Sequence, residues 1–199
     1  MNTSPIDVTD SEPKLLVQLK LSHTTRSFDH FLSRRERFEV NPPYQRGSVW
    51  DVSRRRELIK SALMGLPIGT ITVNDRGYQK SGVDIAVVDG KQRLEALQAF
   101  ADSEFAIPAA WVDPKDVLET EPMDYRGRTV PGVRYSGTSI VFGRRFANMP
   151  LQVTEAAVSG VDAEAEIFML INFAGVAQTD ADRANATVVL TNGASDRTV

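Results

Sequence analysis

One stretch of five consecutive residues has the side chains that phosphate chemistry needs: Asp89, Gly90, Lys91, Gln92 and Arg93. It follows an apolar run at 83–88 and precedes residues 91–101, whose apolar positions have helical spacing, so we expect a strand, a turn and a helix. A turn at a helix N-terminus exposes backbone amides and the positive end of the helix dipole, which favour an anion. Gly90 allows a ligand to approach the backbone, and Arg93 can donate two hydrogen bonds to phosphate. Asp89 can hold Mg²⁺ or orient a water molecule.

The same residues also allow a plainer interpretation. Asp89 would only cap the helix, and Arg93 would lie on its solvent-facing side. The stretch is not a Walker A loop, which needs a longer glycine-rich run and a Lys-Ser/Thr pair. From these residues alone, an anion site and a simple helix cap both stay open.

Residues 41–50 form a second cluster, in which two prolines favour an extended path. Tyr44 and Trp50 offer stacking surfaces, and Gln45 and Arg46 offer hydrogen-bond donors for a base or a phosphate. The alternative is a loop whose aromatic side chains fill the core.

A basic helix is the third feature, predicted from Asp51 or Ser53 to about Met64. The face opposite its apolar positions carries four cations: Arg54, Arg55, Arg56 and Lys60. Arginine suits two-pronged recognition of phosphate, so this face could lie on the backbone of DNA. A solvated face of mixed charge is the alternative, and the net charge of -3 argues against a dedicated DNA-binding protein.

The elements that must position these clusters indicate one domain of the α+β class. Its 199 residues, 42% hydrophobic and 25% charged, are typical of a soluble globular protein. We expect a disordered leader at 1–13 and a single domain at 14–199. Further strands are expected at 37–40, 70–74, 106–111, 138–142 and 150–153, further helices at 27–35 and 163–172, and a strand or short helix at 15–21. The sequence has no cysteine and no apolar stretch near the ~20 residues of a membrane span, which favours a cytoplasmic protein.

Three blocks of sequence together resemble the N-terminal domain of GmrSD-type modification-dependent restriction enzymes, within the ParB/sulfiredoxin-like superfamily. The blocks are residues 43–50, 55–68 and 88–97, and a weaker fourth block follows at 167–176. Their order and spacing match the family over roughly residues 35–185. The resemblance implies a small mixed sheet flanked by helices, with a nucleotide at an Asp-Gly-x-x-Arg turn.

The resemblance also implies roles for individual residues. Asp89 and Arg93 would be catalytic, and Asp89 would hold the metal. The nucleotide would be bound by Tyr44, Gln45, Arg46, Gly90, Lys91 and Gln92. Two positions depart from the family pattern: Lys91 often is Gln there, and Asn172 is followed by Phe-Ala-Gly where the family usually has two glycines.

The implied activity is Mg²⁺-dependent hydrolysis of a nucleoside triphosphate, linked to DNA restriction or counter-defence in a bacterial cell or encoded by a phage. Related enzymes add an HNH-type nuclease, which we do not expect here because the only histidines are His23 and His30. DNA cleavage would then need a separate nuclease or defence protein. The alternatives are a non-catalytic DNA-binding or protein-interaction module, and a metal-dependent DNA nickase of the kind known among ParB-like relatives.

Overall fold

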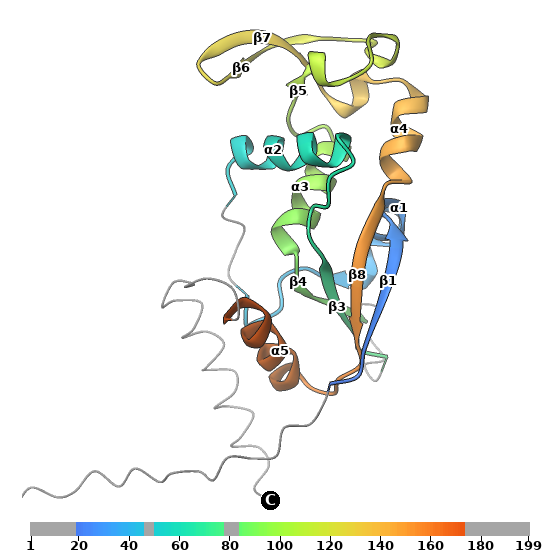
Figure 1. Ribbon diagram of the computed structural model, residues 1–199, viewed down its shortest axis with the longest axis vertical. Coiled ribbons are helices and arrows are strands. Elements are labelled where there is room, and N and C mark those ends of the chain that lie inside the picture. Colours follow the sequence, from blue (N-terminus) through green and yellow to red (C-terminus); the bar gives the residue numbers. More distant parts are fainter. Residues whose placement is uncertain (1–18, 46–49, 78–83, 174–199) are drawn as a thin grey trace, which may run out of the picture.

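The larger of two β-sheets lies at the centre of the molecule (Figure 1). The computed structural model describes residues 19–45, 50–77 and 84–173, and within them this sheet has the strand order β1-β8-β3-β4-β2. The strands are Leu21–Ser27 (β1), Phe38–Glu39 (β2), Ile71–Asp75 (β3), Ile85–Asp89 (β4) and Pro150–Ala156 (β8). β1 and β8 pair antiparallel, as do β3 and β4, whereas β3 pairs parallel with β8 and β2 with β4. The sheet is therefore mixed.

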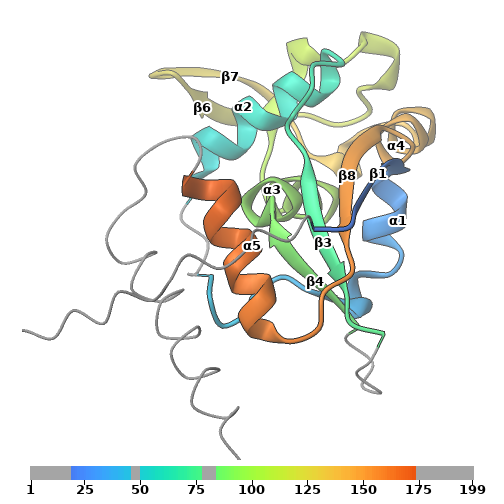
Figure 2. The same cartoon turned by 60° about the horizontal axis from the view of Figure 1, so that its bottom comes forward.

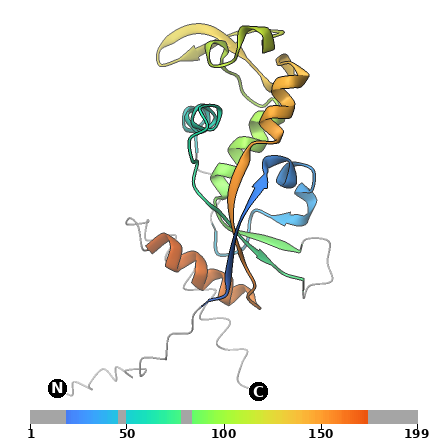
Figure 3. The same ribbon diagram turned by 45° about the vertical axis from the view of Figure 1, so that its right-hand side comes forward.

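Helices cover both faces of this sheet. Neighbouring residues of a strand point to opposite faces, so apolar side chains at successive positions pack against different helices. The α-helices of the described residues are Phe28–Leu32 (α1), Val52–Leu63 (α2), Lys91–Ala101 (α3), Ile140–Ala147 (α4) and Val161–Phe173 (α5). On β4, Val87 belongs to the main core with Leu94 and Phe100 of α3, whereas Val88 packs with Ile167 of α5. Figures 2 and 3 show α1 and α5 on opposite sides of the sheet.

The smaller sheet lies at the far end of the molecule, beyond α2 (Figure 1). Its antiparallel strands have the order β5-β7-β6. They are Ile107–Pro108 (β5), Glu121–Tyr125 (β6) and Arg128–Val133 (β7). Short 3-10 helices complete the described residues: Arg35–Arg37 (η1), Ala109–Trp111 (η2), Pro114–Asp116 (η3) and Tyr135–Gly137 (η4).

The predicted fold class is confirmed, since a small mixed sheet is flanked by helices. α3 spans 91–101 as predicted. α2 begins after Asp51, whose carboxylate accepts a hydrogen bond from the Arg54 amide at 2.8 Å. The predicted leader at 1–13 lies outside the described residues.

One strand prediction was wrong, and a second was confirmed only in part. The segment 138–142 is the start of α4, because the Ser139 hydroxyl accepts a hydrogen bond from the Phe142 amide at 3.1 Å and caps a helix. The segment 106–111 is extended only at β5 and then turns into η2, since Pro108 has no amide with which to continue a ladder.

Other boundaries also differ from the prediction. The helix expected at 27–35 ends at Leu32. β1 begins at Leu21, so most of the predicted element at 15–21 lies outside the described residues. The region 114–137, for which no element was predicted, contains the β6–β7 hairpin. In the part of the chain that the structure describes, no helix is both long and apolar enough to cross a bilayer.

Candidate functional site

The turn between β4 and α3 brings a strand end and a helix N-terminus into close contact with the start of β3. Gly90 is the N-cap of α3 and has a φ of 91°, a left-handed conformation that only glycine adopts without strain. A Cβ atom at this position would lie 2.6 Å from Cδ1 and 3.2 Å from Cα of the buried Ile71. Two separate reasons therefore require glycine at this position: the left-handed backbone conformation and the close packing against β3.

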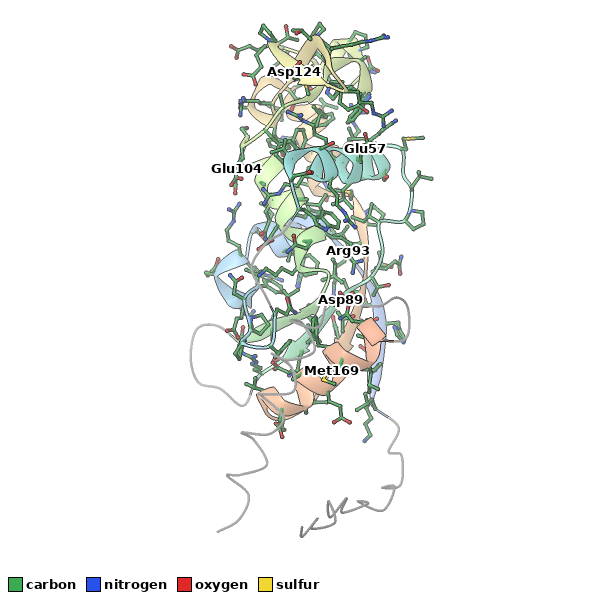
Figure 4. The ribbon with its side chains drawn as sticks, turned by 90° about the vertical axis from the view of Figure 1, so that its left-hand side faces the viewer. Glu57, Asp89, Arg93, Glu104, Asp124 and Met169 are labelled. Atoms are coloured by element: carbon green, nitrogen blue, oxygen red, sulfur yellow. The ribbon has the colours of Figure 1, made fainter. Side chains whose placement is uncertain are left out.

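Arg93 and Asp89 face each other across this turn (Figure 4). The Arg93 Nη2 atom donates to Asp89 Oδ2 at 2.6 Å and to the Thr70 carbonyl at 2.9 Å. The guanidinium also packs on Gly69, where a Cβ would lie 2.9 Å from Nη1. Both charged side chains are about one-quarter exposed, so a ligand can reach them.

One donor of Arg93 has no acceptor in the part of the chain that the structure describes. Its Nε atom is buried and makes no hydrogen bond within the described residues. Leaving such a donor unsatisfied costs free energy that an additional acceptor would recover. The turn thus holds a cation with unused hydrogen-bonding capacity.

Lys91 and Gln92 connect the turn to the second cluster of the sequence. The Lys91 side chain is 5% exposed, and its Nζ atom donates to Asn41 Oδ1 and lies 4.0 Å from Glu95 Oε1. The Gln92 Oε1 atom accepts a hydrogen bond from the Trp50 amide at 3.1 Å. The two clusters are therefore neighbours in space, although Arg46 lies outside the described residues.

Gln45 contacts the end of β4 directly. Its Nε2 atom donates to the carbonyls of Val87 and Val88, both at 2.7 Å. The pairing of β4 with β3 is irregular at this point: Thr72 pairs with Asp89, but Val73 pairs with Val87. Val88 is thus an extra residue without a partner on β3, which is the signature of a β-bulge.

Tyr44 lies deeper in the fold. It is 1% exposed, and its hydroxyl donates to Glu164 Oε2 of α5 at 3.2 Å. Burial, together with the nearby Glu164 carboxylate, raises the pKa of Tyr44 well above its usual range. The ring is therefore part of the core, and its hydroxyl is an anchor on α5.

Glu164 gathers the donors of several elements around one fully buried carboxylate. It accepts from Asn74 Nδ2 at 2.8 Å and from the Arg76 guanidinium, which also pairs with Glu39. This cluster was not predicted from the sequence. Its signal in the sequence is a glutamate that shares one helical face, at spacings of three and four, with Ile167 and Phe168.

Comparison with known proteins identifies the family. The model of the GmrSD restriction endonuclease N-terminal domain matches residues 28–189. The chain belongs to this family. Its GmrSD-type domain contains both clusters described above, and the family associates the chain with restriction. Neither the curated proteins nor the solved structures compared with the chain give a match.

The four cations of the basic helix contact other parts of this GmrSD-type domain. Arg54 stacks on the Trp50 ring at 4.7 Å, and Lys60 lies 5.5 Å from the centre of the Trp111 ring. Arg56 donates to two backbone carbonyls at 2.8 and 3.2 Å, and burial lowers its pKa. Arg55 lies 3.7 Å from Glu104. These cations hold α2 in place within the fold.

The remaining predicted features are the end of α5 and a metal site. Asn172 at the end of α5 donates to the Phe168 carbonyl at 2.8 Å. Among the described residues, no group of three or more His, Cys, Asp or Glu side chains could hold a metal ion. Asp89 is a carboxylate that the structure places next to Arg93 at the turn.

Proposed function

We propose that this GmrSD-type domain binds a nucleoside triphosphate at the β4–α3 turn and hydrolyses it with Mg²⁺. This hydrolysis would be linked to DNA restriction or counter-defence. The observation that carries the proposal is the pairing of a left-handed Gly90 at the N-terminus of α3 with Arg93, whose buried Nε has no acceptor among residues 19–45, 50–77 and 84–173. A helix N-terminus without a capping side chain, next to a cation with a spare donor, suits a phosphate group.

Each residue of the turn has a separate role in this proposal. The backbone amides at the start of α3 would cradle the phosphates, and Arg93 would neutralise the charge that develops during hydrolysis. Asp89 would hold the metal or orient the attacking water. Lys91 and Gln92 would act from the side of the turn that faces Asn41 and Trp50, with which their side chains already form hydrogen bonds.

The donor set fits Mg²⁺ only as a companion of the nucleotide. Asp89 offers one carboxylate, and Mg²⁺ in proteins is often held by one or two carboxylates together with substrate phosphates and water. When bound, Mg²⁺ would supply charge neutralisation at the transferred phosphoryl group. Asp89 is the residue of this chain that would hold it.

Phosphate release from ATP and GTP, each with Mg²⁺, tests the proposal. We expect Arg93→Ala and Asp89→Ala to lower the rate about 100-fold or more, as losses of charge-stabilising groups do. Arg35→Ala is the matched control, because Arg35 forms an exposed ion pair with Asp102 away from the turn. Equal rates in the wild type and both turn variants would refute the proposal.

DNA cleavage in this scheme belongs to a nuclease or another defence protein that responds to the nucleotide state. The alternative of DNA binding through α2 has less support, because its four cations already contact aromatic rings, carbonyls and a carboxylate of the same chain. DNA binding that weakens steeply with salt in the wild type, with a log–log slope about one unit shallower after Lys60→Ala, would restore that alternative.

A further inference from the structure

The end of β4 needs support that its neighbouring strands do not give. β2 pairs with β4 only at Ile85 and Ala86, so the ladder on that side stops before Val87. On the other side, the bulge leaves Val88 without a partner on β3. Asp89, the residue that we place in catalysis, follows directly after this irregular stretch.

The Gln45 side chain supplies that support. One amide nitrogen donates to the carbonyls of both Val87 and Val88, so it takes the place of a neighbouring strand at the bulge. Bulges re-aim the side chain that follows them, and they occur often beside active sites. A donor that fixes the bulge therefore fixes the direction of Asp89.

Gln45 is itself held through its neighbour in sequence. The Tyr44 hydroxyl is bound to Glu164, a fully buried carboxylate that also accepts from Asn74 and Arg76. The segment that carries Gln45 is thus fastened to α5 and to β3 at once. These contacts lie on the face of the sheet covered by α5, where Val88 packs against Ile167.

We propose that Gln45 is a positioning residue that sets the geometry of the Asp89–Arg93 turn by holding the bulged end of β4, with Tyr44 and Glu164 as its anchor. This role differs from direct contact with a nucleotide, which the family resemblance implied for Tyr44 and Gln45. The effect of Gln45 on nucleotide binding rests on the proposed function, but its effect on the order of the turn can be measured without any ligand.

Two measurements on Gln45→Leu and Tyr44→Phe test this role. The first is the dissociation constant for ATP and for GTP with Mg²⁺. The second is amide hydrogen exchange of residues 85–94 without nucleotide, compared with exchange in β8. Tyr125→Phe is the matched control, because it removes a hydroxyl that donates to Glu57 at 2.9 Å, far from the turn.

We expect Gln45→Leu to raise both the dissociation constant and the exchange rate of residues 85–94 about tenfold, since two hydrogen bonds are lost. Tyr44→Phe should shift both in the same direction by a smaller factor, whereas β8 and the control should be unchanged. A weaker affinity with unchanged exchange would mean direct contact with the nucleotide and would overturn the proposal. Faster exchange in β8 as well would mean general destabilisation and would also overturn it.

The two proposals can fail separately. If the wild type binds neither ATP nor GTP, the proposed function fails, and the exchange data alone decide whether Gln45 holds the turn. If the wild type binds a nucleotide and Gln45→Leu changes neither measurement, only the positioning role is refuted.

Discussion

Replacing Gly90 with alanine should destabilise the protein more than its small change in size suggests. A left-handed conformation costs an L-residue about 1–2 kcal/mol. The new Cβ would also lie 2.6 Å from Cδ1 and 3.2 Å from Cα of Ile71, which is fully buried, and such overpacking costs about 1–3 kcal/mol. The expected loss is therefore about 2–5 kcal/mol in the free energy of unfolding, a large part of the total for a domain of this size.

Denaturant unfolding followed by tryptophan fluorescence measures this loss, and Gly65→Ala is the matched control. Gly65 also has a positive φ, 73°, but no heavy atom of another described residue contacts its Cβ position within 4 Å, so only the conformational cost of about 1–2 kcal/mol applies. Ile71→Val removes Cδ1 and should partly rescue Gly90→Ala in the double variant. Equal losses for Gly90→Ala and Gly65→Ala, with additive effects in the double variant, would refute the close packing of the turn on β3.

Two further predictions concern charged groups outside the Asp89–Arg93 turn itself. Glu164→Gln should lower the free energy of unfolding by about 2–4 kcal/mol because it leaves the buried Arg76 with less compensation, whereas Glu155→Gln, in a half-exposed pair, should cost about 0–1 kcal/mol in the same assay. Burial and the Arg34 guanidinium, which donates to Nδ1 at 2.8 Å, lower the pKa of His30 below its usual 6.5, so the unfolded chain binds more protons and stability should fall as pH drops through and below 6.5. A His30→Gln variant should lose that part of the pH dependence in unfolding curves at pH 5.5 and 7.5, and an unchanged dependence would contradict the assignment.

The β4–α3 turn could be predicted from the sequence because its determinants are local. An apolar run, an Asp-Gly pair and helical spacing all lie within fewer than twenty consecutive residues. α2 was predictable for the same reason, since Asp51 stands directly before its first turn. The start of α4 was missed because a run of β-branched and aromatic residues favoured a strand, although Ser139 was available as a cap.

The support of the turn could not be predicted, because it depends on pairing between distant segments. Tyr44 and Glu164 are 120 residues apart, and Arg76 and Glu164 are 88 apart. The bulge at Val88 follows from the register of β3 against β4, and a sequence alone does not fix that register. The two carbonyl partners of Gln45, on a strand more than 40 residues away, could not be predicted for the same reason.

The charge balance of the turn bears on which anions it would select. Asp89 already accepts from Arg93, so an incoming anion must compete with a carboxylate for the guanidinium. A partly exposed ion pair of this kind contributes little free energy. A group with several negative charges can therefore displace Asp89 from Arg93, whereas a singly charged anion has a weaker attraction to the guanidinium. A phosphate chain bound together with a divalent cation would have a further advantage, because Asp89 would then hold the cation and Arg93 would be available to the phosphate. If the proposed function holds, the Asp89–Arg93 pair would thus favour a metal-bound polyphosphate over free phosphate or a carboxylate.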